Sequence, residues 1–211
     1  MFYIFRPHSG GGRIWGMKNI LYTIILSFLF SFSVFADWEA GMDAYNAGDY
    51  ETALKNWIPL AEQGDARAQI HVYMMYSHGE GVTQNDKEAM RWLRLAVEQG
   101  DARAQFELGG EYKVGLSVTR DFKEAMKWYR LAAEQGYADA QFALGAMYLR
   151  GQGVIQDNVI ANMWFNIAAS SAARNAIMFK KTVESKMTPE QITKAEQLAR
   201  ECIKKNYKDC G

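Results

Sequence analysis

Apolar and small residues recur along this chain with helical spacing, and the whole pattern repeats every 36 residues. Residues 65–100 and 101–136 align without a gap, and residues 137–172 follow in the same register. The clearest markers of the period are three tryptophans: Trp92, Trp128 and Trp164. Because a fixed period of this length is typical of stacked helical units, the pattern predicts an all-α solenoid of helix-turn-helix repeats.

Each repeat divides into two predicted helices that are joined by a glycine-bearing loop. In the first helix, apolar and aromatic residues three and four apart form one buried stripe. Its repeated members are Val72, Leu108 and Leu144, followed by Tyr76, Tyr112 and Tyr148. The second helix starts after an Asn or Asp that can accept hydrogen bonds from free backbone N–H groups. These caps are Asn85, Asp121 and Asp157, and the marker tryptophans are expected to fill the space between repeats.

The repeated residues resemble the Sel1-like repeat, a relative of the tetratricopeptide repeat. The motifs that carry the resemblance are A-x-A-Q, G-x-G-V, A-x-x-W and A-A-E-Q-G, which recur from residue 65 to residue 172. The resemblance implies a right-handed α–α superhelix that binds proteins. Two departures stand out. Tyr73 replaces a glycine, which is expected to move the two helices of the first repeat apart, and Ser117 replaces the second loop glycine.

The segments that flank the three repeats are expected to close the array, because the ends of a solenoid would otherwise be apolar. Residues 37–64 read as a degenerate N-terminal repeat, and residues 173–211 as C-terminal capping helices. The last helix is predicted from Thr188, a cap followed by proline at the first helical position, to about Lys205.

The N-terminus is predicted to direct export. Residues 17–36 read as a signal peptide, with a short basic start, an apolar run of 16 residues and a cleavage site after Ala36. An uncleaved anchor is the alternative, although the run is shorter than the ~20 residues that span a bilayer. Residues 1–16 are interpreted as a mis-called upstream extension, with translation starting at Met17. A periplasmic or secreted protein of a Gram-negative bacterium is therefore expected.

The charge of the chain bears on its partners, and its cysteines bear on its compartment. Residues 37–211 carry 21 Lys and Arg against 24 Asp and Glu, which argues against nucleic-acid binding. In an exported protein the two cysteines, Cys202 and Cys210, are expected to form a disulfide. The alternative is two free thiols in a cytosolic protein.

The sequence contains no recognisable catalytic motif or cofactor-binding motif, and no metal site is predicted. His71 and His78 could form a metal pair, but two exposed histidines on a polar face are the preferred interpretation. The repeated Gln69, Gln105 and Gln141 could contact a ligand, but buried amides that bond to backbone are preferred. Some relatives are described as penicillin-binding or hydrolysing. Those carry a disulfide within each repeat, which this chain lacks.

The resemblance implies that the first helices line a concave groove, so we expect partner contacts from positions away from the buried stripe. Three apolar positions, Ile70, Phe106 and Phe142, could instead pack against the next repeat. The expected groove residues are Arg67, Ile70, His71, Met74, His78, Arg103, Phe106, Glu107, Lys113, Asp139, Phe142 and Arg150. Their mixture of cationic and apolar side chains suits an extended or helical peptide with apolar anchors and some acidic character.

The predicted function is that of an exported protein–protein interaction module, a scaffold or adaptor in cell-envelope processes, secretion or host interaction. Two alternatives remain: an envelope enzyme that acts on cell-wall or β-lactam substrates, and a membrane-anchored regulator.

Overall fold

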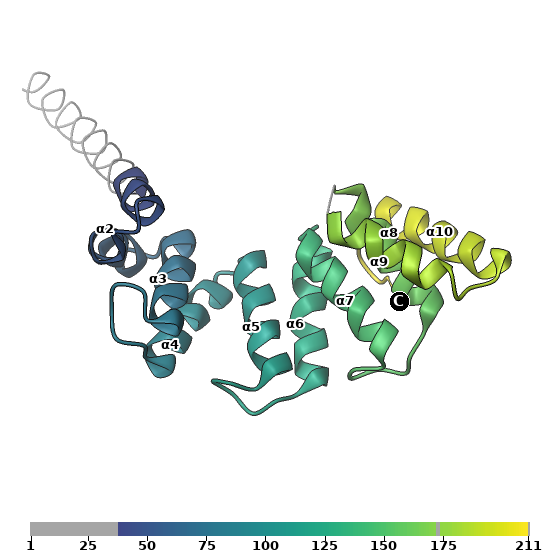
Figure 1. The fold of residues 1–211 in the computed structure, drawn as a ribbon, viewed down its shortest axis with the longest axis horizontal. Helices are drawn as coiled ribbons and strands as arrows, with labels where there is room; N and C mark the ends of the chain where they lie inside the picture. Colours follow the sequence, from purple (N-terminus) through teal and green to yellow (C-terminus); the bar gives the residue numbers. More distant parts are fainter. Residues whose placement is uncertain (1–37, 172–173, 211) are drawn as a thin grey trace, which may run out of the picture.

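The computed structural model describes residues 38–171 and 174–210, which form a curved array of helix pairs (Figure 1). The predicted upstream extension and signal peptide lie outside these residues. No strand occurs in the described ranges, so the all-α prediction is confirmed. Within the same ranges, no helix combines the length and the hydropathy needed to cross a membrane.

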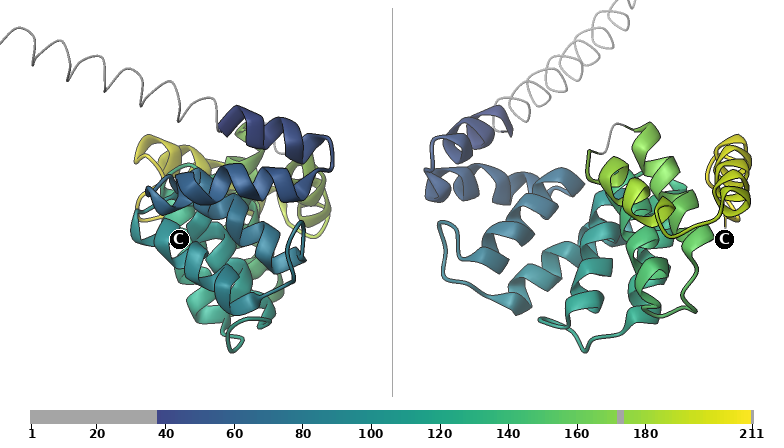
Figure 2. Two further views of the ribbon diagram at one scale, coloured as in Figure 1. Left: turned by 90° about the vertical axis from the view of Figure 1, so that its left-hand side faces the viewer. Right: turned by 45° about the vertical axis from the view of Figure 1, so that its right-hand side comes forward.

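Each repeat contributes two helices of 13 residues. The helices of the three repeats are α3 (Ala66–His78) and α4 (Asp86–Glu98), α5 (Ala102–Val114) and α6 (Phe122–Glu134), and α7 (Ala138–Arg150) and α8 (Asn158–Ser170). A helix over residues 38–46 and α2 (Tyr50–Glu62) precede them. Helices α9 (Arg174–Glu184) and α10 (Pro189–Lys204) follow, and α10 ends the array (Figure 2).

The helix ends have the caps that the sequence indicates. The side chains of Asn85, Asp121 and Asp157 each accept a hydrogen bond from a backbone N–H in the first turn of the second helix. Each first helix ends at a glycine in the left-handed conformation, which a residue without Cβ adopts at little cost. Thr188 and Gln191 form a complete capping box at the start of α10.

Two of the three marker tryptophans are core residues, and so is Trp57 of the leading repeat, which lies one position out of their register. Trp57 is fully buried, Trp92 is 3% exposed and Trp164 is 1% exposed. Trp57 and Trp92 belong to a cluster that runs from the leading repeat to α5, and Trp164 belongs to a second cluster that runs from α6 to the C-terminus. Trp128 is the exception: it is half-buried and packs at the edge of the first cluster. The apolar core is therefore divided into two clusters, and the division falls within the second repeat.

Glycines let the two helices of repeats 2 and 3 approach closely. A Cβ at Gly109 would lie 2.6 Å from Cδ1 of Tyr129, and one at Gly145 would lie 2.7 Å from Cε1 of Phe165. In repeat 1 the sizes are exchanged between the two helices. Tyr73 of α3 stands where the other repeats have glycine, and Leu93 of α4 stands where they have an aromatic ring. Helices α3 and α4 pack as closely as the other two pairs, so the expected separation in repeat 1 is wrong.

The C-terminal segment closes the array against α8. Helix α10 packs on α8, and the predicted disulfide between Cys202 and Cys210 is present with an S–S distance of 2.08 Å. Within the disulfide loop, Tyr207 has a φ of 64°, and its ring lies against Gly136 at the turn between α6 and α7. Closing so short a loop contributes about 2–3 kcal/mol to stability on a chain-entropy argument.

Candidate interaction surface

The three apolar groove candidates serve packing. Ile70 is only 2% exposed and belongs to the core, so its assignment to the groove is wrong. The Phe106 ring lies 5.5 Å from that of Tyr129 and 5.3 Å from that of Tyr137. The Phe142 ring lies 5.5 Å from Phe165 and 5.2 Å from Phe179. This position of the first helix faces the second helix of its own repeat and the element that follows, so its side chains hold helices together.

His71 is also held within the fold. Its ring centroid lies 5.4 Å from that of Trp38, 6.2 Å from that of Tyr45 and 4.6 Å from that of Trp57. Burial, with a smaller effect of the nearby Arg103 charge, lowers the pKa of His71 to about 4, so the ring is neutral at pH 7. The expectation of an exposed His71 is wrong, because the aromatic residues of the leading repeat cover it. His78 is exposed, as expected.

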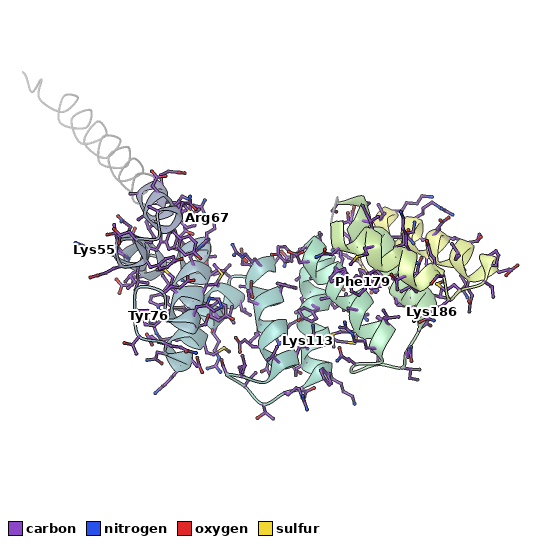
Figure 3. All side chains as sticks on the ribbon, in the orientation of Figure 1. Lys55, Arg67, Tyr76, Lys113, Phe179 and Lys186 are labelled. Carbon is purple, nitrogen blue, oxygen red and sulfur yellow. A yellow bond between two sulfur atoms is a disulfide. The ribbon has the colours of Figure 1, made fainter. Side chains whose placement is uncertain are left out.

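Arg67 extends this aromatic cluster at its exposed edge. Its guanidinium carbon lies 4.7 Å from the centroid of the Trp38 ring, and Nη2 lies 3.0 Å from Oδ2 of Asp65. The side chain of Arg67 is 64% exposed, and it marks the N-terminal end of the array in Figure 3. We found no group of three or more potential metal-ligating side chains in the part of the chain that the structure describes.

The repeated glutamines bond within the fold, which agrees with the interpretation preferred from the sequence over contact with a ligand. Gln69 Nε2 donates to the carbonyl oxygen of Ala61 at 3.0 Å, and Gln141 Nε2 donates to that of Ala133 at 3.3 Å. The amide oxygen of Gln105 accepts from Gln135 Nε2 at 2.9 Å. All three amides are buried, so each bond satisfies a polar atom that would otherwise be costly, although the amide oxygen of Gln141 has no partner among the described residues.

The remaining candidates define an open surface centred on α5. We call this the α5 surface, and it consists of Met74, His78, Arg103, Glu107 and Lys113. Arg103 reaches across the repeat boundary, with Nη2 3.4 Å from Sδ of Met74. Lys113 lies near the middle of the array in Figure 3. Asp139 and Arg150, both exposed, border this surface at the two ends of α7.

The charges of the α5 surface, Arg103, Glu107 and Lys113, are half-buried, and none of them is in an ion pair of the described residues. Burial raises the pKa of Glu107, and the neighbouring Arg103 charge acts in the opposite direction. Burial also lowers the pKa of Lys113, and the Arg150 charge adds to this effect. Among the ion pairs of residues 38–171 and 174–210, none includes Arg103 or Lys113. Both cations therefore remain available to an acidic group from outside the chain.

The corresponding face of repeat 3 is closed. Ala143 and Ala146 stand where α5 has Glu107 and Gly110, and they are 8% and 5% exposed. Small apolar side chains that are already covered offer a partner little to bind. The open surface is therefore narrower than the sequence suggested and is limited to repeats 1 and 2 with the ends of α7.

One residue of this region, Glu111, was missed by the sequence analysis. It occupies the position of Met75 and Met147, which are both fully buried. Tyr73 donates from its hydroxyl to Glu111 Oε1 at 2.8 Å, and the Ser117 N–H donates to Oε2 at 3.4 Å. Burial, with the Glu111 carboxylate, raises the pKa of Tyr73, so the hydroxyl keeps its proton and donates. Tyr73 and Glu111, which both depart from the repeat pattern, thus join repeats 1 and 2, and the backbone of Ser117 holds the same carboxylate within repeat 2.

Comparison with known proteins identifies the class to which this fold belongs. The Sel1 repeat pattern matches three successive segments: residues 67–101, 102–137 and 138–172. The chain therefore belongs to the Sel1 repeat family. Proteins of this family are generally protein-interaction modules and typically non-catalytic scaffolds. A search of curated proteins found no match to this chain.

Solved structures support the same assignment. A Sel1 repeat protein from Oxalobacter formigenes is 39% identical, with a TM-score of 0.56, and the match covers 61% of this chain and 97% of that one. A protective antigen present in uropathogenic Escherichia coli strains, which displays an SLR fold, is 28% identical with a TM-score of 0.52. That match covers 84% of this chain and 47% of the antigen, so this chain spans about half of that protein.

Proposed function

We propose that this chain is an exported interaction module whose α5 surface binds an extended or helical segment of a partner protein. The observation that carries the proposal is the set of half-buried charges on α5. Arg103, Glu107 and Lys113 are partly desolvated without ion-pair partners in the described residues, whereas α7 has small, covered residues at the positions of Glu107 and Gly110. Partly desolvated charges of this kind gain most from a complementary partner.

The chemistry of the surface indicates the kind of segment it would take. Arg103 and Lys113 are cationic, and Met74 beside Arg103 supplies a flexible apolar contact. A partner segment with a carboxylate for these cations and an apolar side chain for Met74 would complement both features. Arginine is also among the residue types that most often dominate binding energy at interfaces.

Two features support export to the periplasm or beyond. Residues 17–36 have the pattern of a signal peptide, and the Cys202–Cys210 disulfide fits an oxidising compartment. The solved antigen from uropathogenic Escherichia coli strains has the same repeat architecture. We therefore propose that the interaction serves cell-envelope processes, secretion or contact with a host.

Reversing two charges of the α5 surface is expected to weaken partner binding strongly. In the variant Arg103→Glu/Lys113→Glu, both cations become acidic, so an acidic partner segment is repelled. We expect recovery of the partner, in affinity capture from the periplasm, to fall at least about tenfold. Phe106 stays unchanged because it packs between Tyr129 and Tyr137.

The matched control is Lys194→Glu/Lys204→Glu, which makes the same charge change on exposed positions of α10. This control should capture the partner as the unchanged protein does, and both variants should keep the helical circular dichroism signal. Equal recovery by all three proteins, or unfolding of the α5 variant, would contradict the proposed surface.

A further inference from the structure

A second feature with binding chemistry lies on α6, outside the α5 surface. A cavity of about 370 Å³ is bounded by α6 and by the loop that joins α7 to α8. We call it the α6 pocket, and its main lining residues are Lys123, Met126, Lys127, Arg130, Leu131 and Val154. Its volume is at the lower end of the range of about 300–1,000 Å³ for ligand sites, so it suits a side chain of a partner.

Gly153 makes this pocket possible. Its φ is 75°, and a Cβ on it would lie 2.6 Å from the carbonyl oxygen of Phe122. Because glycine has no side chain, the loop approaches the first turn of α6 and places Val154 as a wall of the cavity. The pocket is therefore built by the backbone approach of one repeat to the next.

The pocket combines an apolar floor with a cationic rim. Met126 is 6% exposed and forms part of the core, whereas Leu131 is 38% exposed and faces solvent. Lys123, Lys127 and Arg130 surround them, and one acidic residue, Glu134, lies among the lining residues. The rim thus carries an excess of positive charge around an exposed apolar contact.

These cations are weakly neutralised by the chain itself. Arg130 Nη2 donates to the Tyr148 hydroxyl at 3.3 Å, and this neutral partner leaves its charge uncompensated. Lys127 Nζ lies 3.2 Å from Oε2 of Glu124 in an exposed pair, and such pairs contribute little. No ion pair in the described ranges includes Lys123 or Arg130.

The positions of α4 that are equivalent to Lys123, Lys127 and Arg130 are also cationic, so the charges repeat, but the cavity beside α4 has a different lining. That cavity has a volume of about 460 Å³ and contains Glu62 and Glu98 with one cation, Arg91. The loop of the next repeat carries Ser117 where the α6 pocket has Gly153, and neither Ser117 nor Val118 lines the α4 cavity. The wall that Gly153 and Val154 form in the α6 pocket therefore has no counterpart in the α4 cavity, which is bounded instead by the turn between α2 and α3 and is acidic on balance.

From this charge pattern we infer that the α6 pocket binds an acidic protein segment through an apolar side chain. The apolar anchor would rest on Met126, Leu131 and Val154, and flanking carboxylates would pair with Lys123 and Arg130. This second site stands apart from the α5 surface, so one chain could hold two segments of a partner or two partners. Two sites on one chain would strengthen binding of a partner that reaches both, because the second contact forms at a high effective concentration.

The test uses the full chain and two synthetic peptides. The probe is Glu-Glu-Leu-Phe-Glu-Glu, and its charge-reversed counterpart is Lys-Lys-Leu-Phe-Lys-Lys. We expect saturable amide chemical-shift changes, centred on Met126, Leu131 and Val154, with the acidic peptide. Binding should weaken as salt rises, because exposed charges are screened. The charge-reversed peptide should produce no saturable shifts.

Variants locate the binding and separate the two sites. Lys123→Glu/Arg130→Glu is expected to weaken the acidic peptide about tenfold. The matched control is Lys87→Glu/Arg94→Glu, the equivalent positions of α4, which should bind as the unchanged protein does. Equal loss in both variants, equal binding of the two peptides, or loss caused solely by Arg103→Glu/Lys113→Glu would overturn the assignment of this pocket. That last result would still leave the α5 surface as an interaction site.

Discussion

Replacing Trp164 by alanine is expected to lower the free energy of unfolding by about 3–5 kcal/mol. The indole is 1% exposed within the larger apolar cluster, so its removal leaves a cavity that closely packed neighbours fill only in part. Urea denaturation followed by far-ultraviolet circular dichroism would measure the change. This loss is a large fraction of the stability of an ordinary domain.

Trp128→Ala provides the matched comparison, since it removes the same side chain from the equivalent position of the preceding repeat. Trp128 is half-buried at the boundary of the two clusters, and Lys127 Nζ lies 5.3 Å from its ring centroid. Its loss should cost less than about 3 kcal/mol. Equal losses at the two positions would mean that the core is continuous and that its division within repeat 2 is incorrect.

Gly153→Ala is expected to destabilise the chain by about 2–5 kcal/mol, which combines two costs. A φ of 75° costs an L-residue roughly 1–2 kcal/mol. In addition, the new Cβ would lie 2.6 Å from the Phe122 carbonyl oxygen, and backbone displaced by such overpacking costs about 1–3 kcal/mol. Chemical denaturation of the variant and the unchanged protein gives the difference.

Gly100→Ala separates these two costs. Gly100 has a similar φ of 78°, but a Cβ there would meet no atom within 4 Å, so only the conformational cost of about 1–2 kcal/mol applies. The difference between the two variants measures the close approach of adjacent repeats. If both variants lose the same stability, the loop of repeat 3 does not rest on the first turn of α6.

The periodic features of the fold were predictable from the sequence because they depend on local chemistry. The caps Asn85, Asp121 and Asp157 act on their own helices, and the left-handed glycines act on their own turns. The disulfide could be predicted because the chain has just two cysteines and both lie near its C-terminus. Such features repeat with the sequence and need no knowledge of neighbouring repeats.

The exposure of the candidate site residues was not predictable in the same way, since it is set by the element that packs next to each one. Ile70 and His71 are covered by residues brought from elsewhere, and His71 in particular by Trp38 and Tyr45 of the leading repeat. Phe142 is covered in part by Phe179 of α9, which has no counterpart within the repeat pattern. Helical periodicity assigns these residues to a face but does not show what lies against it.

The contacts of Glu111 could have been predicted from departures from the repeat pattern. Tyr73 and Ser117 each break the repeat pattern, and Glu111 breaks it between them by replacing a buried methionine. Two of these departures have a common cause, because Tyr73 and Glu111 form a hydrogen bond between repeats 1 and 2. Ser117 contributes its backbone N–H within repeat 2, so the bond does not depend on its side chain. Comparing the unusual residues of neighbouring repeats with one another, and not only with the repeat pattern, would have predicted this hydrogen bond.

The central claim is that a partner protein binds at the α5 surface, and site-specific photo-crosslinking tests it most directly. A photoreactive amino acid would replace Lys113 in the full chain, and a second protein would carry it at Lys194, an exposed position of α10. Irradiation of cells that express each protein should yield a discrete crosslinked adduct from position 113 and none from position 194. The same adducts from both positions, or an adduct from position 194 alone, would contradict the claim.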